Sequence, residues 1–202
     1  MLYLASRSPR RQQLLRALGR PFRVIPSRYV ERLDPGAPPV WTVVRHAAGK
    51  AACAELPSVR SNRSLVIGAD TVVAIDGRLL GKPATMAQAE QFLRQLSGRS
   101  HWVYTGLALW QPATRRRRIS YARTRVMFHA LTSQAIARWL RQGQPLDKAG
   151  GYAAQDAREW IMRIEGSSSN VIGLPLELLR RELTAFERIS EEKYGEKYVN
   201  AQ

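Results

Sequence analysis

Residues 65–75 form the most apolar stretch of the chain, yet they include one acidic residue, Asp70. The β-branched content predicts a buried central strand, interrupted at residues 68–71. A carboxylate in such a strand is costly unless it is paired, binds a metal or faces a cleft. Asp70 is therefore a candidate metal ligand or general base, and the alternative is a turn residue that ends the strand.

Helical and strand-like patterns alternate along the chain. Strands are predicted at residues 2–5, 22–25, 101–110, 117–129 and 160–164, and Asp76-Gly77 predicts a hairpin after the central strand. Helices are predicted at residues 9–18, 40–56, 86–96 and 133–141 and after Pro175, with loops at 28–39 and 143–151. This alternation, with no internal repeat, predicts an α/β fold with a mixed twisted sheet and flanking helices.

Length and composition suit a single domain over residues 1–202. A chain of 202 residues with 45% hydrophobic residues can bury a full core without disulfides. Its one cysteine, Cys53, cannot form an internal disulfide, and no signal peptide or span of about 18 apolar residues is present. We expect a cytoplasmic protein with no membrane partner. The charged tail at residues 187–202 is either an extension of the last helix or a frayed end.

The net charge of +16 favours contact with phosphate groups. The one dense basic run, at residues 115–118, lies between two strand-like segments, where a solvated hairpin turn is the simpler explanation. No recognition helix or aromatic RNA-binding motif is present, so nucleic acid is not an expected partner. A non-enzymatic nucleic-acid-binding protein stays the alternative, although such a protein gains nothing from an embedded acid such as Asp70.

Ser8, Pro9, Arg10 and Arg11 mark the junction between the first strand and the first helix. Ser8 suits the N-cap and Pro9 the first helical position. The two arginines oppose the positive end of the helix dipole, and a bound anion reverses that effect. The junction is therefore a candidate phosphate site, and solvated arginines are the alternative.

Lysine is rare in this arginine-rich chain. Outside the tail, only Lys50, Lys82 and Lys148 occur, and each supplies a compact point charge that arginine does not. The sequence around Gly81-Lys82-Pro83 is not a Walker motif, because the glycine spacing is one residue short and Pro83 replaces the metal-binding Ser or Thr. A lysine held in such a turn nevertheless suits a phosphate contact.

Two further loops carry mixed polar groups. Residues 147–155 combine an acid, a lysine, two glycines and an amide, a donor and acceptor set suited to a nucleobase edge. Residues 166–170, Gly-Ser-Ser-Ser-Asn, suit an anion-binding nest of backbone amides and hydroxyls. A flexible loop is the alternative for both segments.

Taken in chain order, these motifs resemble those of the Maf family of nucleotide pyrophosphatases. The matching stretches cover residues 4–175: LASRSPRR at 4–11, Lys50-Ala51, GADTVV at 68–73, Gly81-Lys82-Pro83, LSGRSH at 96–101, YTG at 104–106, DKAGGY at 147–152 and NVIGLP at 170–175.

The resemblance implies hydrolysis of a nucleoside triphosphate between the α and β phosphates with a divalent cation, Mg²⁺ or Mn²⁺. It also implies two lobes around a deep cleft, similar to the inosine triphosphate pyrophosphatases, and a homodimer. By motif, Asp70 matches the general base, and Arg11, Lys50 and Lys82, next to the Ser8 cap, match the phosphate-binding cations. Glu31 matches a metal-binding glutamate beside Asp70, although Arg32-Leu33-Asp34 departs from the usual acidic run.

Three positions bear on the substrate. The branch of the family that prefers dTTP and UTP has Arg after Ser-Pro, Thr after the catalytic Asp and Gln at the end of the Asp-Lys-Ala-Gly loop. Arg10, Thr71 and Gln155 match these positions, so the resemblance implies a pyrimidine preference, while Ala153-Ala154 and residues 156–160 depart from the pattern. Family members are also linked to septum formation and division arrest, so a regulator with or without enzyme activity stays open.

Overall fold

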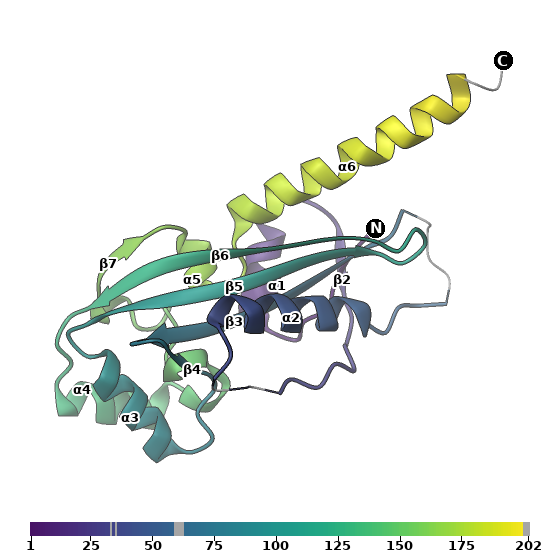
Figure 1. Ribbon diagram of the computed structural model, residues 1–202. Coiled ribbons are helices and arrows are strands. Elements are labelled where there is room, and N and C mark those ends of the chain that lie inside the picture. The colour runs from purple at the N-terminus through teal and green to yellow at the C-terminus, as the bar shows by residue number, and fades with distance from the viewer. Residues whose placement is uncertain (33, 35, 59–62, 200–202) are drawn as a thin grey trace.

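The fold is built on one mixed sheet (Figure 1). The computed structural model describes residues 1–32, 34, 36–58 and 63–199, with side chains described up to residue 188. The described strands run in the order β2-β1-β3-β5-β6-β7, and β4 pairs with β3. Their bounds are β1 Leu2–Leu4, β2 Phe22–Val24, β3 Leu65–Ile75, β4 Arg78–Leu80, β5 Ser100–Gln111, β6 Arg116–Phe128 and β7 Ile161–Glu165.

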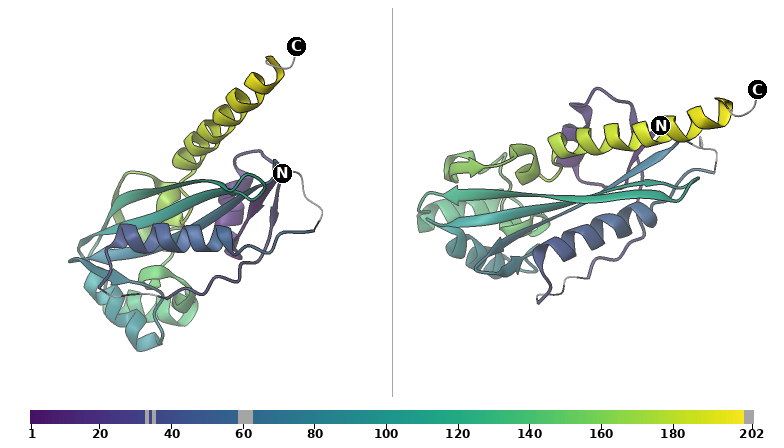
Figure 2. Two further views of the ribbon diagram at one scale, coloured as in Figure 1. Left: turned by 45° about the vertical axis from the view of Figure 1, so that its right-hand side comes forward. Right: turned by 45° about the horizontal axis from the view of Figure 1, so that its top comes forward.

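Helices flank both faces of this sheet, which confirms the predicted α/β class. Helix α2 lies on one face and α6 on the other (Figure 2). The helices are α1 Pro9–Arg16, α2 Pro39–Ala52, α3 Met86–Leu96, α4 Ser133–Gln142, α5 Ser168–Ile172 and α6 Leu176–Val199, with short 3-10 turns η1 Pro145–Asp147, η2 Ala149–Gly151 and η3 Arg158–Trp160. No helix in the described part of the chain is long and apolar enough to cross a membrane.

Side-chain alternation along β3 sorts the core into two layers. Val66 packs with Ala47 and Ala51 of α2, whereas Ile67 packs with Leu15 of α1 and with α6 on the opposite face. A further cluster, which includes Val73, Leu93 and Phe128, fills the end of the sheet near α3 and α4. Neighbouring residues of β3 therefore face different layers, and this also applies to Asp70 and Thr71.

Two glycines allow α2 to approach the sheet closely. A Cβ on Gly68 would lie 2.2 Å from the Ala47 carbonyl oxygen, and a Cβ on Gly106 would lie 2.1 Å from that of Val43. Asp70 lies two residues after Gly68 and pairs across the ladder with Gly106. The side chains of α2 consequently reach the Asp70 carboxylate directly.

One edge of β3 is divided between two short strands. β1 pairs with residues 65–67, and β4 pairs with residues 73–75 of the same edge, while β5 pairs along the other edge. Residues 68–72 thus lie in a gap between β1 and β4. Because both faces of the sheet open at such a gap, the side chains of Asp70 and Thr71 can face one cleft from opposite sides.

The structure corrects several boundaries. β3 is not interrupted at residues 68–71, because its ladder with β5 continues from Val66 to Ala74 and Asp70 is paired there. The helix predicted at 40–56 ends at Ala52, after which residues 53–55 pair with the segment before Tyr29. The predicted loop at 143–151 contains two 3-10 turns, and the tail continues α6 to Val199.

The long β5–β6 hairpin has an open edge. In the described part of the chain, β6 pairs with β7 only at residues 125–128. The predicted turn lies just before β6, with Arg115 at φ 56°, and the next three arginines begin the strand. Two of them hold the hairpin to α6: Arg118 pairs with Glu182 at 2.7 Å, and Arg116 donates to the Phe186 carbonyl oxygen at 3.0 Å.

Candidate active site

A cleft of about 730 Å³ opens at the gap in the edge of β3. It is lined by residues 5–11, the 25–31 loop, two side chains of α2, residues 70–73, Gly81-Lys82, the 147–154 loop and residues 171–173. The segments identified from the sequence as chemical motifs therefore meet around one cavity. The volume is within the usual range for a small-molecule site.

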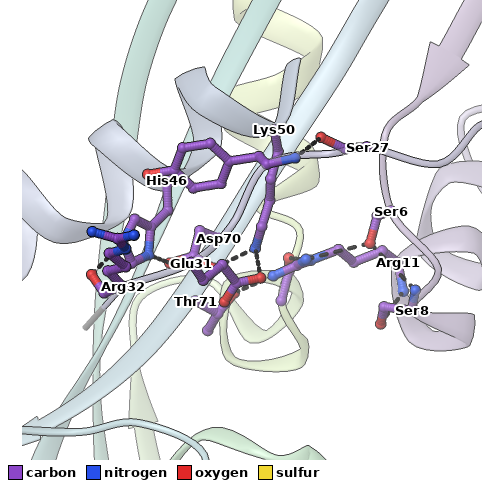
Figure 3. A network of polar contacts seen from close by, with 12 residues as sticks. Ser6, Ser8, Arg11, Ser27, Glu31, Arg32, His46, Lys50, Asp70 and Thr71 are labelled. Carbon is purple, nitrogen blue, oxygen red and sulfur yellow. Dashed lines mark hydrogen bonds and ion pairs between the residues drawn. The ribbon is translucent and has the colours of Figure 1, made fainter. Parts of the chain in front are cut away.

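Asp70 lies at the centre of a charged cluster on the α2 side of the cleft (Figure 3). Its Oδ1 accepts from Nζ of Lys50 at 2.6 Å, and its Oδ2 lies 3.1 Å from Nδ1 of His46. The Lys50 ammonium also contacts Glu31 Oε1 at 2.8 Å. Asp70 is 5% exposed and His46 is 3% exposed, so the cluster is largely withdrawn from water.

The cluster keeps Asp70 ionised. Burial by itself raises the pKa of Asp70, but the hydrogen bond from His46 and the charges of Lys50 and Arg11 outweigh burial and lower it. The hydrogen bond to Asp70 raises the pKa of His46, against the opposing effect of burial. A carboxylate whose pKa is lowered beside these cations suits metal binding or proton transfer.

Glu31, His46 and Asp70 also form a possible metal-binding group. One ligand atom from each of the three lies within 4.8 Å of the others. Carboxylate oxygens suit Mg²⁺ and Mn²⁺, and an imidazole nitrogen is acceptable to Mn²⁺. Since Lys50 already bridges the two carboxylates, the residues fit a divalent cation provided that the ammonium releases one of them.

Local packing brings Glu31 to this cluster. Its loop is held to the end of α2, where Arg28 N–H donates to the Cys53 carbonyl oxygen at 3.0 Å. The Tyr29 ring lies 5.7 Å from the His46 ring. The backbone carbonyl of Arg32 lies 3.1 Å from His46 Nε2. These contacts place the exposed Glu31 carboxylate above Lys50.

Arg11 is held on the opposite side of β3. Its Nε donates to the Gly173 carbonyl oxygen at 2.8 Å, its Nη2 to Thr71 Oγ1 at 3.0 Å and its Nη1 to Ser6 Oγ at 3.4 Å. Ser8 caps α1, as predicted, by accepting from the Arg11 amide at 3.5 Å. The guanidinium is thus oriented by uncharged oxygens and retains its charge for an anion.

The 147–154 loop forms a further part of the cleft wall. Asp147 lies 3.7 Å from Nη1 of Arg10. Lys148 is buried and donates to Asp147 Oδ1 and to the Gln144 carbonyl oxygen, both at 2.7 Å. Arg10 therefore links α1 to this loop, and Lys148 stabilises the loop from within.

Comparison with known proteins assigns the family. Residues 1–186 match the family model described as Maf-like protein. The chain belongs to the Maf family. Among curated Maf relatives, a protein of Gloeobacter violaceus named dTTP/UTP pyrophosphatase is 45% identical over 93% of this chain and 96% of its own length.

Two further Maf relatives carry the same name. The Pelotomaculum thermopropionicum protein is 42% identical over 92% of this chain and 96% of its own length. The Syntrophus aciditrophicus protein is 44% identical over 87% of this chain and 84% of its own length.

Most of the Maf residues singled out from the sequence line the cleft: Ser8, Arg10, Arg11, Glu31, Lys50, Asp70, Thr71 and Lys82. Gln155 is half-buried and is not among the lining residues, which end at Ala154 in this loop. Lys82 is exposed at the rim, in the turn whose Gly81 carbonyl accepts from the Gly150 amide at 3.0 Å.

The predicted anion nest at residues 166–170 is instead the capped start of α5. Ser167 is the N-cap. The hydroxyls of Ser167 and Ser169 donate to Glu177 Oε2 at 2.7 and 3.0 Å. The backbone N–H of Asn170 donates to Ser167 Oγ at 3.1 Å. An acid of the same chain thus occupies two of the hydroxyl donors that the sequence suggested for a bound anion.

The sequence analysis missed His46. The three histidines are far apart in the chain, and no metal-binding spacing is present. The available signal was the i, i+4 relation between His46 and Lys50 within a predicted helix, which places both side chains on one face. The buried helix face that carries Lys50 to Asp70 carries His46 there as well.

Proposed function

We propose that the protein hydrolyses dTTP and UTP to the monophosphate and pyrophosphate, using a divalent cation. The supporting observation is the cluster of Asp70, Lys50, His46 and Glu31 in the same cleft as Arg11. An acid held ionised beside several fixed cations suits phosphoanhydride hydrolysis, in which phosphate charge must be stabilised and a water activated. The names of the curated relatives support the same reaction.

In this proposal the basic residues bind phosphate, and the acidic residues bind the cation and the attacking water. Arg11, Lys50 and Lys82 bind the triphosphate, and Ser8 keeps Arg11 at the start of α1. Asp70 orients the attacking water and is placed to accept its proton while the bond between the α and β phosphates breaks. Glu31 and Asp70 would hold the cation, with His46 fixing the Asp70 carboxylate. When bound, Mg²⁺ or Mn²⁺ neutralises phosphate charge and makes the water more acidic.

The pyrimidine preference is the finer part of the proposal. Arg10 and Thr71 line the cleft, and the Thr71 hydroxyl already contacts Arg11 and Thr105, each at 3.0 Å. Thr71 therefore contributes to base choice through the position of Arg11. Gln155 directly follows the last lining residue of its loop, Ala154, and its motif position supports a part in base choice. If Gln155→Glu leaves the rate ratio of UTP to GTP unchanged, Gln155 has no part in base choice.

A panel of nucleoside triphosphates tests the reaction. The protein is incubated with each of the canonical ribo- and deoxynucleotides and with Mg²⁺ or Mn²⁺, and both pyrophosphate and orthophosphate are measured. We expect pyrophosphate to be released with dTTP and UTP as the preferred substrates and activity to disappear with a chelator. Release of orthophosphate alone, or no turnover with any nucleotide, contradicts the proposal.

The assembly and location implied by the resemblance are further parts of the proposal. We propose a homodimer, which light scattering of the purified protein tests directly. We also propose a reducing cytoplasmic setting, in keeping with the exposed, free Cys53.

A further inference from the structure

The wall of the cleft changes character between its two sides. Around Asp70 and Arg11 it is charged, whereas Val73, Tyr152 and Ala153 contribute an apolar part of the lining, next to Lys148 of the same loop. Val103 of β5 also belongs to this apolar wall. Since a nucleotide has a charged triphosphate and a flat, weakly polar base, the apolar wall is the natural place for the base. How that wall is held then determines how well the base is bound.

Tyr152 is fixed in this wall from beneath. Its hydroxyl lies 2.7 Å from Nε2 of His101, and the two residues are 5% and 1% exposed. The Phe128 ring meets both of them edge-on, with centroids 4.8 Å from each. Burial lowers the pKa of His101 to about 4, although the Arg99 carbonyl opposes the shift. Near neutral pH the buried pair is therefore an uncharged hydrogen bond.

The backbone before Tyr152 is constrained as well. Gly150 and Gly151 have φ values of 69° and 77°, a conformation that favours glycine. A Cβ on Gly150 would lie 3.0 Å from Cγ2 of Val73. The loop therefore packs tightly on β3, which fixes the backbone of Tyr152. The hydrogen bond to His101 then fixes the direction of the Tyr152 ring.

We propose that His101 is a positioning residue for the nucleobase: by holding the Tyr152 hydroxyl beneath the cleft, it keeps the Tyr152 ring in the wall on which the base lies. The inference rests on the proposed nucleotide substrate. His101 is the last residue of the 96–101 motif, and the proposed hydrolysis mechanism gives it no role.

Removing one partner of the His101–Tyr152 hydrogen bond should disturb the cleft more than replacing both partners. In His101→Phe, the Tyr152 hydroxyl loses its buried partner, and an unpaired buried hydroxyl is costly. The ring then turns toward the water of the cleft and disturbs the base wall. In the double variant His101→Phe with Tyr152→Phe, both polar partners are replaced by apolar rings, an exchange that can be nearly neutral. The second substitution should therefore rescue the first.

Calorimetric binding of two ligands tests this inference without requiring turnover. The ligands are α,β-methylene-dUTP, which has a base, and tripolyphosphate, which has none, each with Mg²⁺. We expect His101→Phe to weaken binding of the dUTP analogue about five- to tenfold and to change tripolyphosphate binding less than twofold. The double variant should recover most of the lost affinity. For UTP hydrolysis, KM should rise more than kcat falls.

Thr124→Val is the matched control. Thr124 is fully buried in the neighbouring strand β6 and contacts Ser167 and Asn170, but it does not line the cleft. Its loss should lower thermal stability and leave both affinities unchanged. The inference is overturned if His101→Phe binds both ligands like the wild type, if it weakens both equally, or if the double variant shows no rescue. Wild-type protein that binds the analogue but hydrolyses no nucleotide overturns the proposed function alone.

Discussion

The two sides of β3 at the cleft hold their charges in different ways. On the α2 side, Lys50 and His46 are matched by two carboxylates. On the opposite side, the described hydrogen bonds of Arg11 all end on uncharged oxygens. The first arrangement pairs its cations with carboxylates, whereas the second orients a cation through uncharged oxygens, with Asp70 and Glu31 acting on it through space. The paired acid and the oriented Arg11 cation are therefore reached from adjacent residues of β3, Asp70 and Thr71.

This difference arises from strand geometry. Successive side chains of β3 point to opposite faces, and the gap between β1 and β4 opens both faces to one cavity. Substitutions on each side should consequently affect different kinetic constants. The following predictions test that separation, beginning with the largest effect.

Asp70→Asn tests the α2 side. The amide keeps the shape of the carboxylate but cannot accept a proton or provide charge to a cation. We expect kcat for UTP to fall about a thousandfold and KM to change only a few-fold, with an unchanged circular dichroism spectrum. Near-normal kcat in this variant would show that the acid is not part of the reaction.

Arg11→Met tests the opposite side. Removing an oriented cation should lower kcat/KM about a hundredfold and weaken inhibition by tripolyphosphate, because the lost contact is to phosphate. Arg16→Met is the matched control, since Arg16 is exposed in the last turn of the same helix and does not line the cleft. Equal losses in the two variants would attribute the effect to overall charge.

Gly106→Ala tests how close packing supports the α2 side. The added methyl group would overlap the Val43 carbonyl, so α2 must shift and carry Lys50 and His46 away from Asp70. We expect the free energy of unfolding to fall by about 1–3 kcal/mol and kcat to fall about tenfold. Gly36→Ala is the control, because its Cβ would meet only the Asp34 carboxylate at 3.5 Å. Urea unfolding and UTP kinetics check both variants.

The pH dependence gives the smallest effect. The pKa of His46 in the folded protein is raised above its ordinary value of 6.5. The protonated His46–Asp70 pair therefore contributes its full free energy of stabilisation below pH 6.5, and this contribution is lost as the pH rises through the raised pKa. In Asp70→Asn, the main cause of the shift is removed, and the His46 pKa should fall. NMR titration of the His46 ring in chelated protein measures both values. Identical titrations would refute the coupling.

The sequence predicted the regular elements better than it predicted their contacts. The helix at 86–96 was placed correctly because its apolar spacing is local. The supposed interruption of β3 was wrong, because the pairing that compensates Asp70 comes from α2, which is distant in the chain. His46 was overlooked for the same reason.

Polar loops were the least predictable part of the site. The serines at 167–169 suggested a bound anion, but α6 supplies Glu177 to them. Gln155 was expected at the base from its motif position, yet the cleft lining stops one residue earlier. In both cases, the composition of a loop identified its donors and acceptors but not their partners.

Part of one edge of β6 is unpaired in the described part of the chain. Residues 116–124 lie outside its pairing with β7, and an uncovered strand edge can template association with further copies of the chain. Arg117 and Arg123 stand exposed along this edge. Charged side chains along an unpaired strand edge disfavour such association.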